Sequence, residues 1–232
     1  MRKVLYTLVI LLIMGLQSAA AQNYEVVYTM KMNAGEIVKM FASESGMPED
    51  MMAFLKEDIK KARLTVQLNV SEDKSMMKFL KDQSKFEINM MGMKMDAAPM
   101  LDNMGLNSYS DYSKNESYTI SHLGGKSYIV RDEETSPLKF TKTSEKKTIL
   151  GHVCHKMTDK ENGSIVWYAE DIPFKTKMYP GVPGLVLEMS EVSGGFTFTA
   201  KSYRPTDKPV TMPKDARKVT QAEVDKMIEN MH

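Results

Sequence analysis

The stretch "MYPGVPGLVLEMSEVSGGFTFTAKSY" (residues 178–203) decides the fold. Two Pro-Gly pairs, Pro180-Gly181 and Pro183-Gly184, precede an apolar run, and Gly194-Gly195 separates that run from a second β-rich segment. Pro followed by Gly favours a tight turn, and a Gly-Gly pair between β-rich runs favours a hairpin. The stretch therefore predicts a stiff corner, with up to two type II turns in succession, that leads into an antiparallel pair of strands.

The same pattern recurs along the chain. Gly124-Gly125 divides residues 116–130 into two β-rich runs, and "KENGS" separates "KTILGHVCHKMTD" (147–159) from "IVWYAEDI" (165–172). Residues 24–32 and 64–70 alternate apolar with polar side chains, which is typical of half-buried strands. We expect a mainly β fold with minor α content: a single-domain antiparallel meander whose sheet is curved or forms a half-open barrel.

Two helices interrupt the strand pattern. Pro48 begins a segment in which apolar residues recur at helical spacing, and Glu49 and Asp50 suit the positive end of a helix dipole. The sequence predicts a helix near 48–61. Thr220 and Glu223 form a capping box that predicts a short C-terminal helix.

The first residues have the features of a cleaved secretory signal. A basic start at Arg2 and Lys3 precedes an apolar run and then small residues up to Ala21. We expect residues 1–21 to be removed, which leaves residues 22–232 as one domain in the periplasm or outside the cell. Because no later apolar run is long enough to cross a bilayer, we expect no transmembrane segment in the mature chain.

The charges exclude one class of partner. The chain has 31 Lys and Arg against 30 Asp and Glu, with the two signs interspersed. Proteins that bind nucleic acid by electrostatics carry a concentrated positive charge, so we expect no nucleic-acid partner.

The corner at 180–186 also carries a resemblance. "PGVPGLVLE" is similar to the signature of the GLPGLI family, and the match covers Pro180, Gly181, Val182, Pro183, Gly184, Leu185 and Val186. "ILGHVCHKM" and "VWYAEDIP" resemble two further motifs of that family. The resemblance implies an exported envelope protein of one group of Gram-negative bacteria, with a β fold and no established activity. It implies no catalytic residues.

The residues themselves favour a non-enzymatic protein. Cys154 is the single cysteine, so no intramolecular disulfide forms. His152 shares a strand face with Cys154, but no third group orients them as a nucleophile and base. We interpret Cys154 as a buried core thiol, since free cysteines are commonly buried.

Methionine is unusually frequent, with 22 in the chain. Flexible thioethers suit varied apolar partners. We therefore expect the protein to bind an apolar ligand, a lipid or a polypeptide, or to assist an outer-membrane system as an envelope accessory protein. The residues that suggest a groove for it are Met51, Met52, Phe54, Leu55 and Trp167.

A second hypothesis is copper buffering. Met-x-Met spacing on a strand places two thioethers on one face, and soft sulfur ligands select Cu(I). The candidate ligands are Met90, Met91, Met93, Met95, Met30 and Met32. We expect no cofactor under the first hypothesis and copper under the second. A hydrolase is the weakest alternative, because no nucleophile elbow or HExxH motif is present.

Overall fold

The computed structural model describes residues 23–45, 49–90, 92–101, 106–133, 138–191 and 195–229. The predicted signal peptide lies outside these residues. The elements in chain order are β1 (Asn23–Met32), α2 (Ala34–Ser45), α3 (Glu49–Lys61), β2 (Leu64–Val70), β3 (Lys74–Phe79), the short helix η1 (Lys81–Gln83), β4 (Glu87–Met90), β5 (Met93–Asp96), α4 (Ala98–Leu101), β6 (Ser108–Asp111), β7 (Glu116–Leu123), β8 (Lys126–Arg131), β9 (Phe140–Ile149), β10 (His152–Asp159), β11 (Ile165–Ala169), β12 (Leu185–Glu191), β13 (Phe196–Thr206), β14 (Arg217–Val219) and α5 (Gln221–Glu229).

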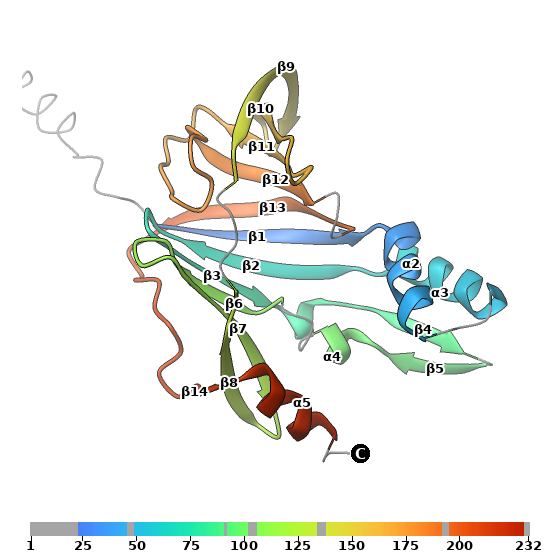
Figure 1. The fold of residues 1–232 in the computed structure, drawn as a ribbon. Helices are drawn as coiled ribbons and strands as arrows, with labels where there is room; N and C mark the ends of the chain where they lie inside the picture. Colours follow the sequence, from blue (N-terminus) through green and yellow to red (C-terminus); the bar gives the residue numbers. More distant parts are fainter. Residues whose placement is uncertain are drawn as a thin grey trace, which may run out of the picture.

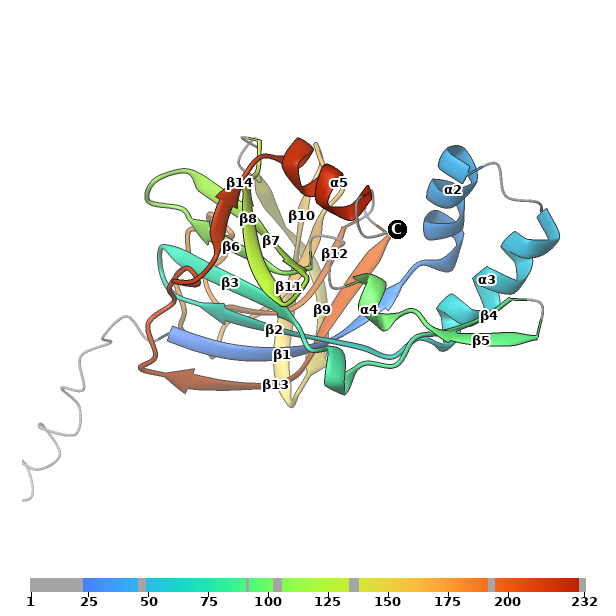
Figure 2. The ribbon, with the colours of Figure 1, turned by 90° about the horizontal axis from the view of Figure 1, so that it is seen from below.

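One curved sheet of 12 strands contains most of these elements. Its strand order is β14-β8-β7-β6-β3-β2-β1-β13-β12-β11-β10-β9, and every pairing is antiparallel except that of β14 with β8. The first strand lies in the middle (Figure 1), because β13 returns to pair with it. In Figure 2, β8 and β10 rise on the same side of the central strands. The predicted mainly β meander is confirmed, and the sheet is curved and open.

The hairpins predicted at Gly124-Gly125 and Gly194-Gly195 are confirmed by the antiparallel pairs β7–β8 and β12–β13, although Gly194 itself lies outside the described residues. Gly124 and Gly125 have φ of 56° and 75° between β7 and β8, and Gly195 has φ of 66° before β13. The hairpin predicted for 147–159 and 165–172 is present as β10 and β11, but the first run contains a further turn that the sequence analysis did not predict. Leu150 and Gly151 both have positive φ and form a two-residue turn, so that β9 ends at Ile149 and β10 begins at His152.

The two predicted helices are present. Helix α3 matches the prediction for 48–61, although Pro48 lies outside the described residues. At α5, the Thr220 backbone N–H donates to Glu223, and the Glu223 N–H donates to the Thr220 hydroxyl, which completes the capping box. Among the described residues, no helix combines the length and apolar character needed to cross a membrane.

Helix α2 was not predicted. Its start has a recognisable signal, because the Asn33 side chain accepts hydrogen bonds from the backbone N–H groups of Gly35 and Glu36. Together with α3 and the β4–β5 hairpin, α2 lies at one end of the sheet (Figure 1).

The largest hydrophobic core begins at the central strands. Alternate residues of β1 are buried, and those of β2 are buried opposite them: Tyr24 faces Val70, Val26 faces Leu68, Tyr28 faces Val66 and Met30 faces Leu64. Each fully buried aliphatic side chain of this kind contributes about 1.5–3 kcal/mol. The period-two pattern in the sequence therefore fixes which face of the sheet is covered.

Candidate ligand-binding site

A pocket of about 880 Å³ lies in the hollow of the curved sheet. Strands β2, β3, β6 and β7 line it from one half of the sheet. Strands β9, β11 and β12, with the β11–β12 loop (170–184), line it from the other half. This volume falls within the range of pockets that hold drug-sized molecules.

The first half of the sheet supplies five hydroxyl groups, which we call the hydroxyl wall, from Ser75, Ser108, Ser110, Ser117 and Tyr112. Leu68, Met77, Asn115 and Glu116 line the pocket beside them. The pairing registers bring the serines together: Ser75 of β3 lies opposite Ser110 of β6, which lies opposite Ser117 of β7. Residues directly opposite in adjacent strands point to the same face, so the serines form a row across three strands.

The hydroxyl wall is held by its own hydrogen bonds. The hydroxyls of Ser75 and Tyr112 lie 2.8 Å apart, and the Ser117 hydroxyl donates to Ser110 Oγ at 2.9 Å. Burial raises the pKa of Tyr112, and its bonds to Ser75 and Ser110 oppose that shift. Tyr112 is therefore a neutral hydroxyl at physiological pH. A hydroxyl has one proton to donate and two lone pairs to accept, so these groups retain capacity toward a ligand.

The second half supplies a mainly apolar wall, formed by Leu138, Phe140, Val166, Met178, Tyr179 and Met189. Ser164, Lys177 and Pro180 also line the pocket on this side. The rings of Phe140 and Tyr179 meet edge to face with centroids 6.1 Å apart. The Tyr179 hydroxyl donates to Met189 Sδ at 3.0 Å, which turns the polar end of this ring toward β12. The pocket thus has one wall rich in hydroxyl groups and one wall that is mainly apolar.

The Pro180-Gly181 pair shapes the apolar wall. The Val182 N–H donates to the Tyr179 carbonyl at 3.1 Å, and Gly181 has φ of 81°, so residues 179–182 form the predicted type II turn. Tyr179 and Val182 are buried beside Val166, while Pro180 reaches the pocket. The corner is therefore a strand entrance that also lines the pocket.

The Pro183-Gly184 pair works differently. Gly184 does not have positive φ, so the expectation of a second type II turn is wrong at this position. A β-carbon at Gly184 would instead overlap the Ala169 carbonyl oxygen. This glycine permits close contact between the end of the loop and β11.

The loop also joins the two halves of the sheet. The Lys177 N–H donates to the Glu72 carbonyl in the β2–β3 turn at 2.7 Å. Leu185 N–H donates to the Ile172 carbonyl at 3.3 Å, which ties the end of the loop to its beginning. These bonds hold Met178 and Tyr179 between the two halves.

Charge is sparse in the pocket. Among its described lining residues, Glu116 and Lys177 carry the formal charges, one of each sign. Glu116 pairs with Arg131 at 3.8 Å, and Lys177 is exposed to solvent. The pocket therefore offers no net charge to a ligand.

The residues expected to form a groove lie elsewhere. Helix α3 packs against α2 and β4 and approaches β1; Leu55 is buried, Met52 is half-buried and Phe54 is 67% exposed. The Met51 side chain lies outside the described residues. Trp167 belongs to β11, beneath the Lys147 ammonium at 4.2 Å from its ring centre. None of these described residues lines the pocket.

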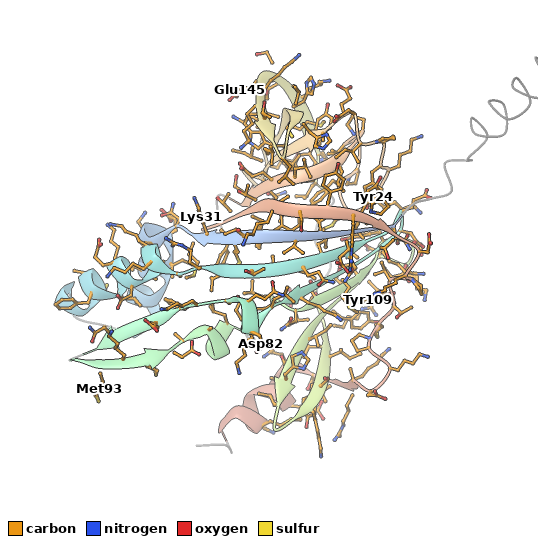
Figure 3. The ribbon with its side chains drawn as sticks, turned by 180° about the vertical axis from the view of Figure 1, so that it is seen from behind. Tyr24, Lys31, Asp82, Met93, Tyr109 and Glu145 are labelled. Atoms are coloured by element: carbon orange, nitrogen blue, oxygen red, sulfur yellow. The ribbon has the colours of Figure 1, made fainter. Side chains whose placement is uncertain are left out.

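The proposed copper ligands are also dispersed. Met30 is fully buried in the core and Met32 is half-buried, whereas Met93 and Met95 are 72% and 42% exposed on the β4–β5 hairpin. Figure 3 shows Met93 at the tip of that hairpin. Met91 and the Met90 side chain lie outside the described residues. Within the described ranges, no group of three or more His, Cys, Asp or Glu side chains converges as a metal site.

Cys154 is buried, and burial raises the pKa of its thiol. The His152 ring makes its hydrogen bonds elsewhere, through Nδ1 to Asp171 at 2.7 Å and through Nε2 to the Tyr203 hydroxyl at 2.8 Å. The thiol instead donates weakly to the His152 carbonyl at 3.6 Å. This arrangement lacks the thiolate–imidazole contact that nucleophilic catalysis requires.

Sequence reasoning missed the serines of the hydroxyl wall. Their signal is the alternation in "SYSD" (108–111), where both serines share one strand face. The register that aligns them with Ser75 and Ser117 is long-range, because the β4–β5 hairpin and two short helices, η1 and α4, separate β3 from β6.

No protein-family model matches the chain, and no curated protein matches its sequence. Among solved structures, the chain is similar to PNGF-II in its C2 crystal form, with a TM-score of 0.47 and 18% identity. The P21 form of PNGF-II gives 0.46 and 16%. Each match covers 90% of this chain but 33% of the PNGF-II chain, so this chain spans about a third of that protein's length.

Proposed function

We propose that this chain is a non-catalytic binding protein that holds an amphipathic molecule in the pocket between the two halves of its sheet. The observation that carries the proposal is the pair of opposed walls, one rich in hydroxyls and one mainly of apolar side chains. A ligand with a polar edge and an apolar body satisfies both, because buried hydroxyls need partners and apolar surface gains free energy when it leaves water.

The nature of the pocket also supports binding over catalysis. Its described lining contains neither a histidine nor a cysteine, and its one carboxylate is paired with Arg131. Acyl transfer and acid–base chemistry commonly use such groups in direct contact with the substrate.

The cell envelope is the proposed location. Support comes from the signal-like residues 1–21 and from the similarity of Pro180–Val186 to the GLPGLI signature. Expression of the full chain in a Gram-negative host tests it: the mature protein should be recovered from the periplasm with Gln22 as its first residue. Recovery of the uncut chain from the cytoplasm would contradict export.

Binding is tested with the neutral apolar fluorophore Nile red. We expect saturable enhancement of its emission by the purified protein, and native mass spectrometry after gentle purification should reveal co-purified amphiphile. Ser110→Phe fills the pocket from the hydroxyl wall and should weaken Nile red binding at least about tenfold, since bulk there displaces the ligand.

The matched control is Ser144→Phe, because Ser144 is an exposed residue of β9 that does not line the pocket. Circular dichroism and thermal melting establish that both variants fold. Equal Nile red affinity in the folded Ser110→Phe and Ser144→Phe proteins would contradict the proposed site.

A further inference from the structure

The hydroxyl wall indicates which kind of amphipathic ligand the pocket binds. Its recognition groups are neutral alcohols from three adjacent strands, joined by one phenol. A carboxylate, phosphate or ammonium head group buried against them would lack a countercharge. Burial of an unpaired charge is far more costly than burial of a hydrogen-bonded neutral group.

The charges at the pocket reinforce this selection. Arg131 lies 3.8 Å from Glu116, and its positive charge offsets the attraction that Glu116 would exert on a cationic head. Lys177 is exposed, and an ion pair with an exposed lysine contributes little free energy in water. Neither a positively nor a negatively charged ligand therefore gains binding free energy from the charges at the pocket.

The spacing of the serine hydroxyls allows one ligand to form hydrogen bonds with several of them at once. Ser75, Ser110 and Ser117 are neighbours across strands, at about 4.5–5.5 Å between β-carbons. Ser108 lies two residues along β6, about 6.6–7 Å from Ser110. The serines therefore form a grid comparable in size to a sugar ring, whose hydroxyls both donate and accept, as serine hydroxyls do.

The facing wall then needs an apolar group on the same molecule. Phe140, Val166, Met178 and Met189 offer no hydrogen-bonding hydroxyl, and the Tyr179 hydroxyl is already bonded to Met189. Ser164 adds one hydroxyl to this mainly apolar side. We infer that the ligand is an uncharged polyhydroxylated amphiphile, a sugar head joined to an apolar chain, with the sugar on the hydroxyl wall and the chain on the apolar wall. This inference rests on the proposed binding function.

Isothermal titration with dodecyl maltoside, kept below its micelle concentration, tests the ligand class. Maltose tests the sugar alone, and dodecanoate and dodecyltrimethylammonium test the chain with a charged head. We expect the glycoside to bind at least about tenfold more tightly than each of the other three, which corresponds to one or two net hydrogen bonds.

The double variant Ser110→Ala, Ser117→Ala removes two hydroxyls with little change in shape. It should weaken dodecyl maltoside about tenfold and leave Nile red and dodecanoate unchanged. Ser144→Ala removes an exposed hydroxyl on β9 and is the matched control. It should change the affinity for none of the three ligands. Circular dichroism checks the fold of each variant.

The outcomes separate the two proposals. If charged and glycosylated chains bind equally, or if the double variant binds the maltoside normally, the ligand class is wrong while Nile red binding keeps the pocket as a binding site. If maltose alone binds as tightly as its dodecyl glycoside, the apolar chain has no role and the amphiphile is wrong. If neither the amphiphiles nor Nile red bind, the proposed function fails as well.

Discussion

Gly184 lies directly against the backbone of Ala169 at the point where the β11–β12 loop enters β12. A β-carbon at Gly184 would stand 2.9 Å from the Ala169 carbonyl carbon and 3.2 Å from the Tyr168 ring, and would overlap the Ala169 carbonyl oxygen. Gly181, three residues earlier, has open space around its α-carbon but requires φ of 81°. The two glycines of one motif are thus needed for different physical reasons.

The first prediction follows from this difference. Gly184→Ala should lower the free energy of unfolding by about 3 kcal/mol or more, because β12 must move away from β11 to admit the methyl group. Gly181→Asn should cost less than about 1 kcal/mol, since asparagine tolerates the left-handed region. Urea unfolding of the two variants measures both values, and a larger loss for Gly181→Asn would contradict the assignment.

The architecture was predictable because strand alternation and glycine turns are local signals. Gly124-Gly125 predicted its hairpin correctly, and the Thr220–Glu223 capping box predicted α5. Leu150-Gly151 was missed, since leucine rarely adopts positive φ and does not mark a turn. The local signals thus fail where a residue adopts a conformation atypical of its type.

The pocket was less predictable because it depends on long-range register. Ser75 and Ser117 meet through Ser110 only once three strands align. The methionines of α3 gave a strong local pattern, yet that helix packs at the end of the sheet, away from the pocket. The methionine content therefore suggested a groove at α3, and the described residues of that groove do not line the pocket.

Asp159 should make the β9–β11 region sensitive to acid. Its carboxylate is buried and accepts hydrogen bonds from the N–H groups of Lys139 at 3.0 Å and Glu161 at 2.9 Å, with more from Asn162. Burial raises the pKa of Asp159, but these hydrogen bonds outweigh it and lower the pKa overall. Its stabilising effect is therefore present above about pH 4, the usual carboxyl range, and lost as the pH falls further.

Asp159→Asn should accordingly lower the melting temperature at pH 7, and the difference from the wild type should shrink as the pH approaches 3. Thermal melts followed by circular dichroism over this pH range provide the measurement. Asp207→Asn, at an exposed carboxylate beyond β13, is the control and should have little effect at any pH. A constant difference for Asp159→Asn at all pH values would show that charge has no part in its role.

Cys154 should be inert in the folded protein. The thiol is fully buried, so a reagent cannot reach it. Burial also raises its pKa, which lowers the fraction of reactive thiolate. We expect negligible reaction with a chromogenic disulfide reagent at pH 8 and complete reaction in denaturant. Val153→Cys in a Cys154→Ala background is the control, because Val153 is 54% exposed on the same strand and its thiol should react at once.

Copper binding stays a prediction from the Met-x-Met spacing. The β4–β5 hairpin is the place to test it. Met93 and Met95 are exposed, so Met93→Leu with Met95→Leu should abolish any competition with a chromophoric Cu(I) chelator while changing stability little. Met30→Leu is the control, because Met30 is buried in the core and should affect stability by less than about 1.5 kcal/mol and copper not at all. Failure of the wild-type protein to compete under reducing conditions would end the copper hypothesis.

Tyr28 should make the protein sensitive to alkali. Its buried hydroxyl donates to the Val186 carbonyl at 2.8 Å, which joins the central strand β1 to β12. Burial raises the pKa of this phenol well above its ordinary value. Because the folded protein favours the neutral phenol, the stability it contributes is present below about pH 10 and lost as the pH rises above that value.

Tyr28→Phe should cost about 1–2 kcal/mol at pH 7, since the Val186 carbonyl loses its buried donor. Above pH 10 the stability of the wild type should fall, and the stability of the variant should fall less. Urea unfolding at pH 7 and at pH 11 measures both effects, and Tyr128→Phe, at a half-buried tyrosine of β8, is the comparison. If Tyr28→Phe and the wild type lose stability equally between these pH values, ionisation of Tyr28 is not coupled to unfolding.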